Sequence, residues 1–132
     1  MFVKQNSGYK YFTGDKLCNI RLDEMKLFPE ELLLLAPSKE IGAEWRFVIS
    51  RGKIITYSLY GDILSSANPS GFVEEVLSST ELDPAPIWTM DVCEYDGYRV
   101  VEINSLLSAG WYDADVTKIV EEVDKLANEL LP

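Results

Sequence analysis

The amino-acid sequence predicts an α+β fold, an antiparallel sheet with helices packed on one side of it. Residues 44–50 alternate between apolar and polar side chains, which is the period of a half-buried strand. Asp96-Gly97 separates two further strand-like stretches and is a strong signal for a tight antiparallel turn. From Asp115 onward, apolar residues recur at the spacing of one helix face. The chain has 132 residues, which predicts a single domain over 1–132.

The first forty or so residues carry weaker signals. Residues 2–4 are typical of a short strand, residues 15–21 predict a second strand, and residues 23–27 fit a short helical turn. The apolar run 32–36 allows two interpretations. Pro29 and the two acids after it favour a helix, whereas the continuous apolar run and the proline that follows it favour a buried strand.

The rest of the chain predicts two hairpins and two helices. A turn after residues 44–50 leads into a returning strand over 54–60. Asn68-Pro69 is typical of a helix start. The strands 87–95 and 98–104 form the second hairpin, and the last helix follows it.

The amino-acid composition excludes several classes of function for this protein. The 22 Asp and Glu outnumber the 12 Lys and Arg, for a net charge of -10, so we expect no nucleic-acid partner. The chain has no histidine, which excludes a Ser-His-Asp triad and histidine-dependent zinc sites. Cys18 and Cys93 are too few for a disulfide framework and suit a reducing compartment. No apolar run approaches the ~20 residues of a membrane span, so we expect a cytoplasmic protein that does not bind membranes.

The turn of the second hairpin predicts which residues face each other. A two-residue loop places Glu94 opposite Arg99 and, further along, Asp91 opposite Glu102. Facing carboxylates with Cβ atoms about 5 Å apart repel each other without compensation. Asn104 lies two residues beyond Glu102 and therefore on the same face.

Two acids and an amide on one face suggest a metal site. Oxygen ligands suit Mg²⁺, above all where phosphates complete its coordination. The metal-site hypothesis therefore rests on Asp91, Glu102 and Asn104. The alternative is a solvated outer face that carries a mildly unfavourable pair.

The few basic residues suggest a phosphate site only if they converge. Lys4 follows a short apolar strand, Lys10 lies in a loop bounded by glycines, and Arg46 shares a strand face with Glu44. Lysine and arginine both suit phosphate oxygens. Taken singly, each is more often an ordinary surface charge.

Several short motifs follow one another along the chain. In order they are Phe2-Val3-Lys4, Lys10-Tyr11-Phe12-Thr13-Gly14, Glu44-Trp45-Arg46-Phe47-Val48, Gly52-Lys53, Ser58-Leu59-Tyr60, Asp91, Val101-Glu102-Ile103-Asn104 and Ala109-Gly110-Trp111-Tyr112-Asp113. The ordered set resembles the ATP-grasp fold, and most closely its Arg-two-Lys clade. That clade includes bacterial and phage proteins and a eukaryotic assembly factor for translation initiation. The resemblance covers nearly the whole chain.

The resemblance implies ATP and Mg²⁺ as cofactors. Asp91, Glu102 and Asn104 would hold Mg²⁺ against the ATP phosphates. Arg46 and Lys10 would contact phosphates as the catalytic residues.

Further nucleotide contacts follow from the same resemblance. Lys4 would also contact phosphates, and Glu44 would touch the ribose or orient the clade's arginine. Leu34 and Leu35 would lie in a hinge strand that presents backbone groups to adenine, and the loop 108–110 would close over the phosphates or the acceptor.

The implied activity is a carboxylate–amine or carboxylate–thiol ligase that forms an acyl phosphate, with a small-molecule or peptide acceptor. Family members have an additional N-terminal region before the strand of Lys4, so the fold is expected to lack that region. Three explanations stay open: the sequence is that of a truncated member, a second copy or a partner subunit supplies the region, or the protein binds nucleotide without ligase turnover. The alternatives are a non-catalytic nucleotide-binding assembly factor or regulatory module, and a purely structural domain.

Overall fold

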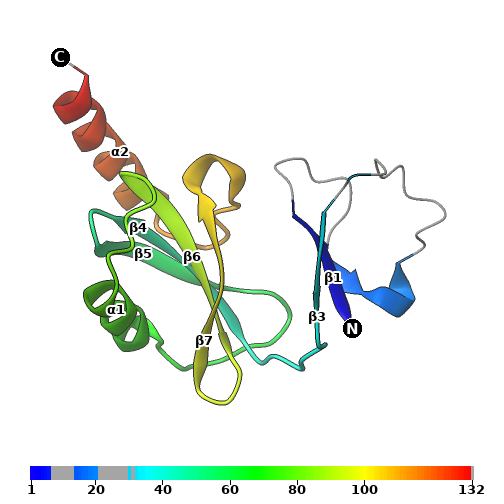
Figure 1. The fold of residues 1–132 in the computed structure, drawn as a ribbon. Helices are drawn as coiled ribbons and strands as arrows, with labels where there is room; N and C mark the ends of the chain where they lie inside the picture. Colours follow the sequence, from blue (N-terminus) through cyan, green and yellow to red (C-terminus); the bar gives the residue numbers. More distant parts are fainter. Residues whose placement is uncertain (7–13, 21–29, 31, 132) are drawn as a thin grey trace. The chain divides into compact units, whose positions relative to one another are not determined.

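The computed structural model describes residues 1–6, 14–20, 30 and 32–131. These residues form two compact units, an N-terminal unit Met1–Glu40 and a C-terminal unit Ile41–Pro132, and each is described by itself. The predicted α+β class is confirmed, because the described residues form two antiparallel sheets and two α-helices (Figure 1).

The N-terminal unit holds a three-stranded sheet in the order β2-β1-β3. Its strands are β1 (Phe2–Gln5), β2 (Asp15–Lys16) and β3 (Leu33–Ala36). The apolar run is therefore a strand rather than a helix. Of the strand predicted over 15–21, Asp15–Lys16 are confirmed, Leu17–Asn19 form a 3₁₀ turn instead, and Arg21 lies outside the described residues. The helical turn predicted over 23–27 lies outside the described residues.

The C-terminal unit holds a four-stranded antiparallel sheet in the order β5-β4-β6-β7. The strands are β4 (Glu44–Ser50), β5 (Lys53–Tyr60), β6 (Ile87–Glu94) and β7 (Tyr98–Ser105). The pattern of two hairpins predicted from the sequence is confirmed, and β4 and β6 form the centre of the sheet.

Two helices flank this sheet, α1 (Ser70–Ser79) and α2 (Val116–Leu130). Both begin where the sequence predicted, with Pro69 and Asp115 as N-caps, and the Asp115 side chain accepts from the backbone N–H of Lys118 at 3.3 Å. Neither helix in the described ranges has the length and apolar character needed to cross a membrane.

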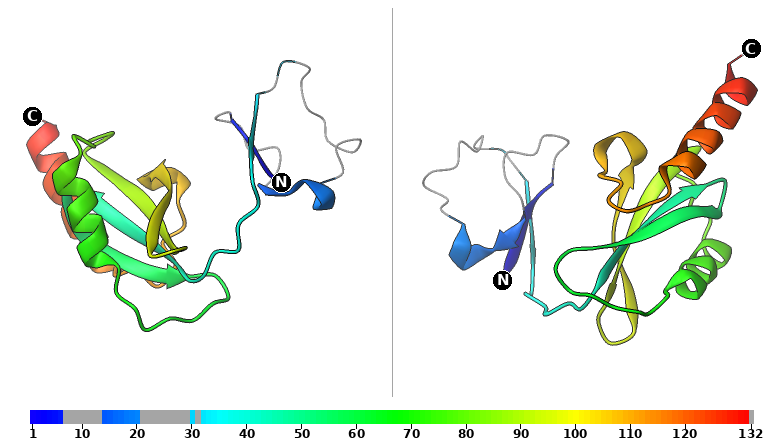
Figure 2. Two further views of the ribbon diagram at one scale, coloured as in Figure 1. Left: turned by 60° about the horizontal axis from the view of Figure 1, so that its bottom comes forward. Right: turned by 180° about the vertical axis from the view of Figure 1, so that it is seen from behind.

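The two helices cover opposite faces of the sheet (Figure 2). Val73 of α1 packs with Trp45 and Phe47, whereas Ile119 of α2 packs with Val48. Since neighbouring strand residues point to opposite faces, the expectation of helices on one side only is wrong for this sheet. Six of the seven β4 residues are buried, so both faces of this central strand need a cover.

The register of the β6–β7 hairpin departs from the prediction in two places that cancel. Glu94 pairs with Tyr98, so the loop has one residue more than predicted and Arg99 lies opposite Cys93 instead of Glu94. A register shift next to Asp91 then skips one β7 residue and restores the predicted partner, Glu102. The predicted pairing of Glu94 with Arg99 is therefore wrong, whereas the predicted pairing of Asp91 with Glu102 is confirmed.

Candidate functional site

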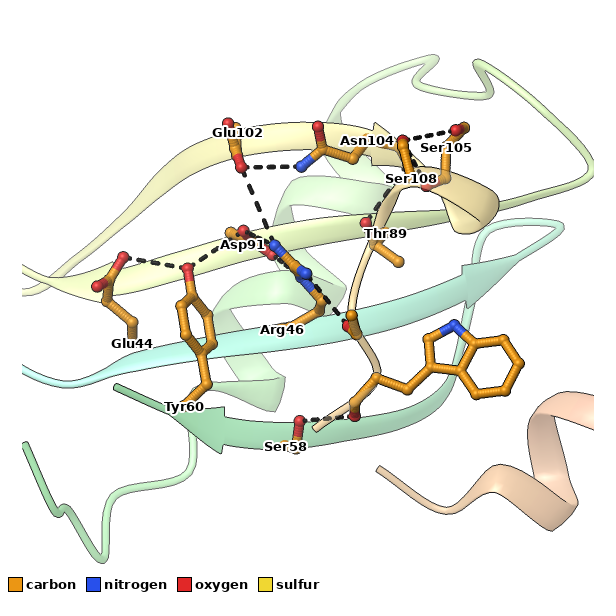
Figure 3. Close-up of polar contacts among 12 residues, drawn as sticks. Glu44, Arg46, Ser58, Tyr60, Thr89, Asp91, Glu102, Asn104, Ser105 and Ser108 are labelled. Carbon is orange, nitrogen blue, oxygen red and sulfur yellow. Dashed lines mark hydrogen bonds and ion pairs between the residues drawn. The ribbon is translucent and has the colours of Figure 1, made fainter. Parts of the chain in front are cut away.

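Three charged side chains form a row across the middle of the four-stranded sheet (Figure 3). Arg46 on β4 is the direct cross-strand partner of Asp91 on β6, and Asp91 is the partner of Glu102 on β7. Asn104 lies two residues further along β7 and donates through Nδ2 to Glu102 Oε1 at 2.9 Å. The row lies on the face opposite the α1 core, because Arg46 alternates with Trp45 and Phe47 along β4.

The centre of the row is a buried two-pronged ion pair. Arg46 Nε donates to Asp91 Oδ1 at 2.7 Å and Nη2 donates to Oδ2 at 2.6 Å. The two side chains are only 9% and 1% exposed. The hydrogen bonds to Asp91 are the largest cause that raises the pKa of Arg46. Glu102 Oε1 lies 4.0 Å from Nη2, so Arg46 also offsets the repulsion between the facing carboxylates.

Tyr60 and Glu44 complete the cluster at one end. The Tyr60 hydroxyl lies 3.2 Å from Glu44 Oε1 and 3.2 Å from Asp91 Oδ2. Burial is the largest cause that raises the pKa of Tyr60, and the neighbouring carboxylates add to it. Burial also raises the pKa of Glu44, against the hydrogen bond from Tyr60, which lowers it. The Tyr60 ring stacks on Tyr112, with ring centroids 4.8 Å apart.

Tyr60 is a site residue that the sequence did not reveal. It is the β5 partner of Glu44. A plain count from the β4–β5 turn pairs Glu44 with Leu59 instead, because a register shift beside Val48 moves the pairing by one residue. The available signal is that a tyrosine ends the strand that returns beside Glu44 and Arg46.

The segment between β7 and α2 is held against the same face. Arg46 Nη1 donates to the backbone oxygen of Gly110 at 3.1 Å, and Ser58 Oγ donates to that of Trp111 at 3.4 Å. The backbone N–H of Asp115 donates to Thr56 Oγ1 at 3.1 Å. The loop that the resemblance implied over the phosphates is therefore fixed next to Arg46.

The residues fit a magnesium ion in chemistry but not as they stand. Asp91, Glu102 and Asn104 bring carboxylate and amide oxygens to one face, as Mg²⁺ prefers. Arg46, however, binds both oxygens of Asp91. Within the ranges that the structure describes, no three Asp, Glu or Cys side chains are grouped to hold a metal ion. A cation at Asp91 would therefore share this carboxylate with Arg46, which already donates one hydrogen bond to each of its oxygens.

The other predicted nucleotide residues lie in the N-terminal unit. Lys4 on β1 is the cross-strand partner of Leu34 on β3, and Leu35 follows it. The side chains of Leu34 and Leu35 are 52% and 57% exposed on a strand at the edge of its sheet. Lys10 lies outside the described residues.

Comparison with known proteins gives one family. A family model for the ATP-grasp domain, family 3 of the Arg-two-Lys clade, matches residues 5–123 of the 132-residue chain. The match includes the row of Arg46, Asp91 and Glu102, while Lys4 lies just before it. Searches of curated proteins and of solved structures return no match.

The family match confirms the resemblance seen in the sequence motifs. ATP-grasp proteins are usually ligases, and they typically use ATP and Mg²⁺, so membership implies a protein of the ATP-dependent ligase kind. The match spans most of the chain, and this chain belongs to the ATP-grasp family as a member of family 3 of the Arg-two-Lys clade.

Proposed function

We propose that this protein binds ATP with Mg²⁺ and activates a substrate carboxylate for attack by an amine or a thiol. The observation that carries the proposal is the row of Arg46, Asp91 and Glu102 on one sheet face, with Asn104 beside it. This face combines a phosphate-binding guanidinium with three oxygen-bearing side chains. That combination is what a magnesium–triphosphate complex requires.

In this proposal Arg46 binds phosphate oxygens, and Asp91, Glu102 and Asn104 hold Mg²⁺, which neutralises phosphate charge. Glu44 touches the ribose or orients Arg46. The loop at Gly110, already bonded to Arg46, lies where the phosphates or the acceptor would bind.

The family resemblance assigns further nucleotide contacts to residues of the N-terminal unit. Lys4 and Lys10 bind phosphates. Leu34 and Leu35 lie on the edge strand β3, where backbone groups can face adenine. Among the described residues, no strand pairs with β3 on its outer edge, which supports that role.

The proposed reaction has two steps. A substrate carboxylate oxygen attacks the γ-phosphorus of ATP, the bond to the β-phosphate oxygen breaks, and an acyl phosphate and ADP form. An amine or thiol then attacks the acyl carbon, phosphate leaves, and an amide or thioester results. Positioning and charge neutralisation supply the catalysis, so a chain without histidine can carry it out.

A second candidate is a nucleotide-binding assembly factor or regulatory module without turnover. The Arg46–Asp91 ion pair favours it, because in this arrangement both groups are engaged with each other. ADP release that rises with an acceptor would separate the ligase from this alternative.

The test measures binding of a non-hydrolysable ATP analogue with and without Mg²⁺. Binding is monitored by the melting temperature of the protein and by calorimetry. We expect the analogue to stabilise the protein only when Mg²⁺ is present. Glu102→Gln should weaken Mg²⁺-dependent binding by about tenfold or more. Glu74→Gln, the same change at an exposed site on α1, should leave it unchanged. Absence of Mg²⁺-dependent binding by the parent chain would rule out the proposal.

A further inference from the structure

Arg46 has two N–H donors that no described residue accepts. A guanidinium carries five N–H donors in one plane. Nε and Nη2 each use one donor on Asp91, at 2.7 and 2.6 Å, and Nη1 uses one on the backbone oxygen of Gly110 at 3.1 Å (Figure 3). Glu102 Oε1 lies 4.0 Å from Nη2, which is too far for a hydrogen bond. Arg46 therefore has donors left for phosphate oxygens while it stays on Asp91.

Two aromatic rings lie beside the same guanidinium. Arg46 Cζ is 5.4 Å from the centroid of the Tyr60 ring and 5.3 Å from that of the Tyr112 ring. Both distances are within the range of cation–π attraction. The rings stack on each other with centroids 4.8 Å apart and an interplanar angle of 7°, so each ring keeps the other in place. Three hydrogen bonds and two rings therefore fix the orientation of Arg46 through contacts of the protein alone.

Tyr112 is held beside Arg46 by an unusual backbone conformation. Its φ of 49° is left-handed, a region that residues other than glycine seldom adopt. The chain around it is anchored, because the backbone oxygen of Trp111 accepts from Ser58 Oγ at 3.4 Å and from the backbone N–H of Ala114 at 2.9 Å. Tyr112 is nevertheless 55% exposed, so burial in a core does not explain why the loop holds it there. Such a strained position is a candidate for a functional role.

We propose that Tyr112 is a positioning residue for nucleotide binding, whose ring holds the Arg46 guanidinium in the orientation that leaves two N–H donors for phosphate oxygens. This inference rests on the proposed function. An arginine side chain that is already ordered loses less conformational freedom when it binds a ligand, and binding is therefore stronger. The competing role for Tyr112 is structural, in which its ring only packs the loop between β7 and α2 onto Tyr60.

A matched pair of substitutions at Tyr112 tests the proposal. Tyr112→Leu removes the ring and keeps an apolar side chain, whereas Tyr112→Phe keeps the ring and removes a hydroxyl that makes no hydrogen bond to a described residue. Substitutions of Tyr60 would not isolate the ring, because its hydroxyl also contacts Glu44 and Asp91. The readout is the Kd of a fluorescent non-hydrolysable ATP analogue at a fixed Mg²⁺ concentration, with the melting temperature as the check that each variant is folded. Tyr112→Leu should raise this Kd about fivefold, and Tyr112→Phe should leave it unchanged.

A second background tests whether Tyr112 acts through the guanidinium. Arg46→Lys keeps a positive charge beside Asp91 but has no planar group whose orientation a ring could fix, so addition of Tyr112→Leu there should no longer raise the Kd. The same rise in both backgrounds would overturn the proposal, because Tyr112 would then act on the nucleotide without Arg46. Equal Kd values for Tyr112→Leu and Tyr112→Phe would also overturn it, with the proposed function intact. If the parent chain shows no Mg²⁺-dependent binding, the proposed function and this inference both fail.

Discussion

The two faces of the four-stranded sheet differ in what they bury. The face under α1 is apolar, with Trp45, Phe47 and Met90 at 2% exposure or less. The opposite face of the same strands buries a charged pair, Arg46 and Asp91. Apolar burial stabilises a fold, whereas a buried ion pair contributes little net stability and is costly to break. Strand alternation thus places a purely apolar core on one face, and on the other the charged pair beside a smaller apolar cluster around Val48 and Ile119.

The largest effect is expected on the apolar face. Phe47 is fully buried and stacks on Tyr57 with ring centroids 4.8 Å apart. Phe47→Ala should lower the free energy of unfolding by about 3–5 kcal/mol, measured by urea denaturation, because it leaves a cavity in the core. The folded fraction should still bind Mg²⁺ and nucleotide like the parent, since this side chain points away from the site. A loss of binding affinity in the folded protein would show that the two faces are not independent.

The next largest effect is a difference in stability between substitutions of Asp91 and Glu102, the two acids of the charged row on the polar face. From the sequence alone, Asp91→Asn and Glu102→Gln should each preserve or raise stability, because each relieves carboxylate repulsion. The structure changes this expectation for Asp91→Asn. Removal of the negative charge leaves Arg46 buried without its ion-pair partner. Asp91→Asn should lower the free energy of unfolding by about 3 kcal/mol.

Glu102→Gln is the matched comparison for that substitution. Glu102 lies 4.0 Å from Arg46 and its side chain is 23% exposed, so its loss should change stability by no more than about 1 kcal/mol. Both variants should weaken Mg²⁺-dependent nucleotide binding by about tenfold or more. Equal stability of the two variants in thermal and urea denaturation would contradict the view that Arg46 is held by Asp91.

Local patterns account for what could be predicted of this site. Strand alternation and the turn signal at Asp96-Gly97 were enough to place Asp91 opposite Glu102, even though the loop is longer and a register shift compensates for it. The sequence could not give the two departures separately. The longer loop takes one extra residue from β6, and the register shift skips one residue of β7. The two changes cancel, so the pairing from Asp91 onward is the predicted one.

Non-local pairing accounts for what was missed. Arg46 and Asp91 are 45 residues apart and meet because β4 pairs with β6, which no short-range signal specifies. Tyr60 reaches the cluster only through the register shift beside Val48. The prediction that the helices lie on one side of the sheet is wrong for a related reason. The alternation of β4 indicates one apolar face, but it does not indicate that a helix covers the other face too.

The smallest effect concerns Glu44, at the edge of the polar face. Burial raises the pKa of Glu44 in the folded state, so folding favours its protonated form. The stability that Glu44 contributes is therefore present at low pH and is lost as the pH rises through its raised pKa. Glu44→Gln does not titrate, so its stability relative to the parent should increase between about pH 5 and pH 8, by less than about 1 kcal/mol because the site is partly solvated. Urea denaturation at both pH values, with Glu74→Gln as the exposed control, measures this change, and a gain that shrinks with rising pH would contradict it.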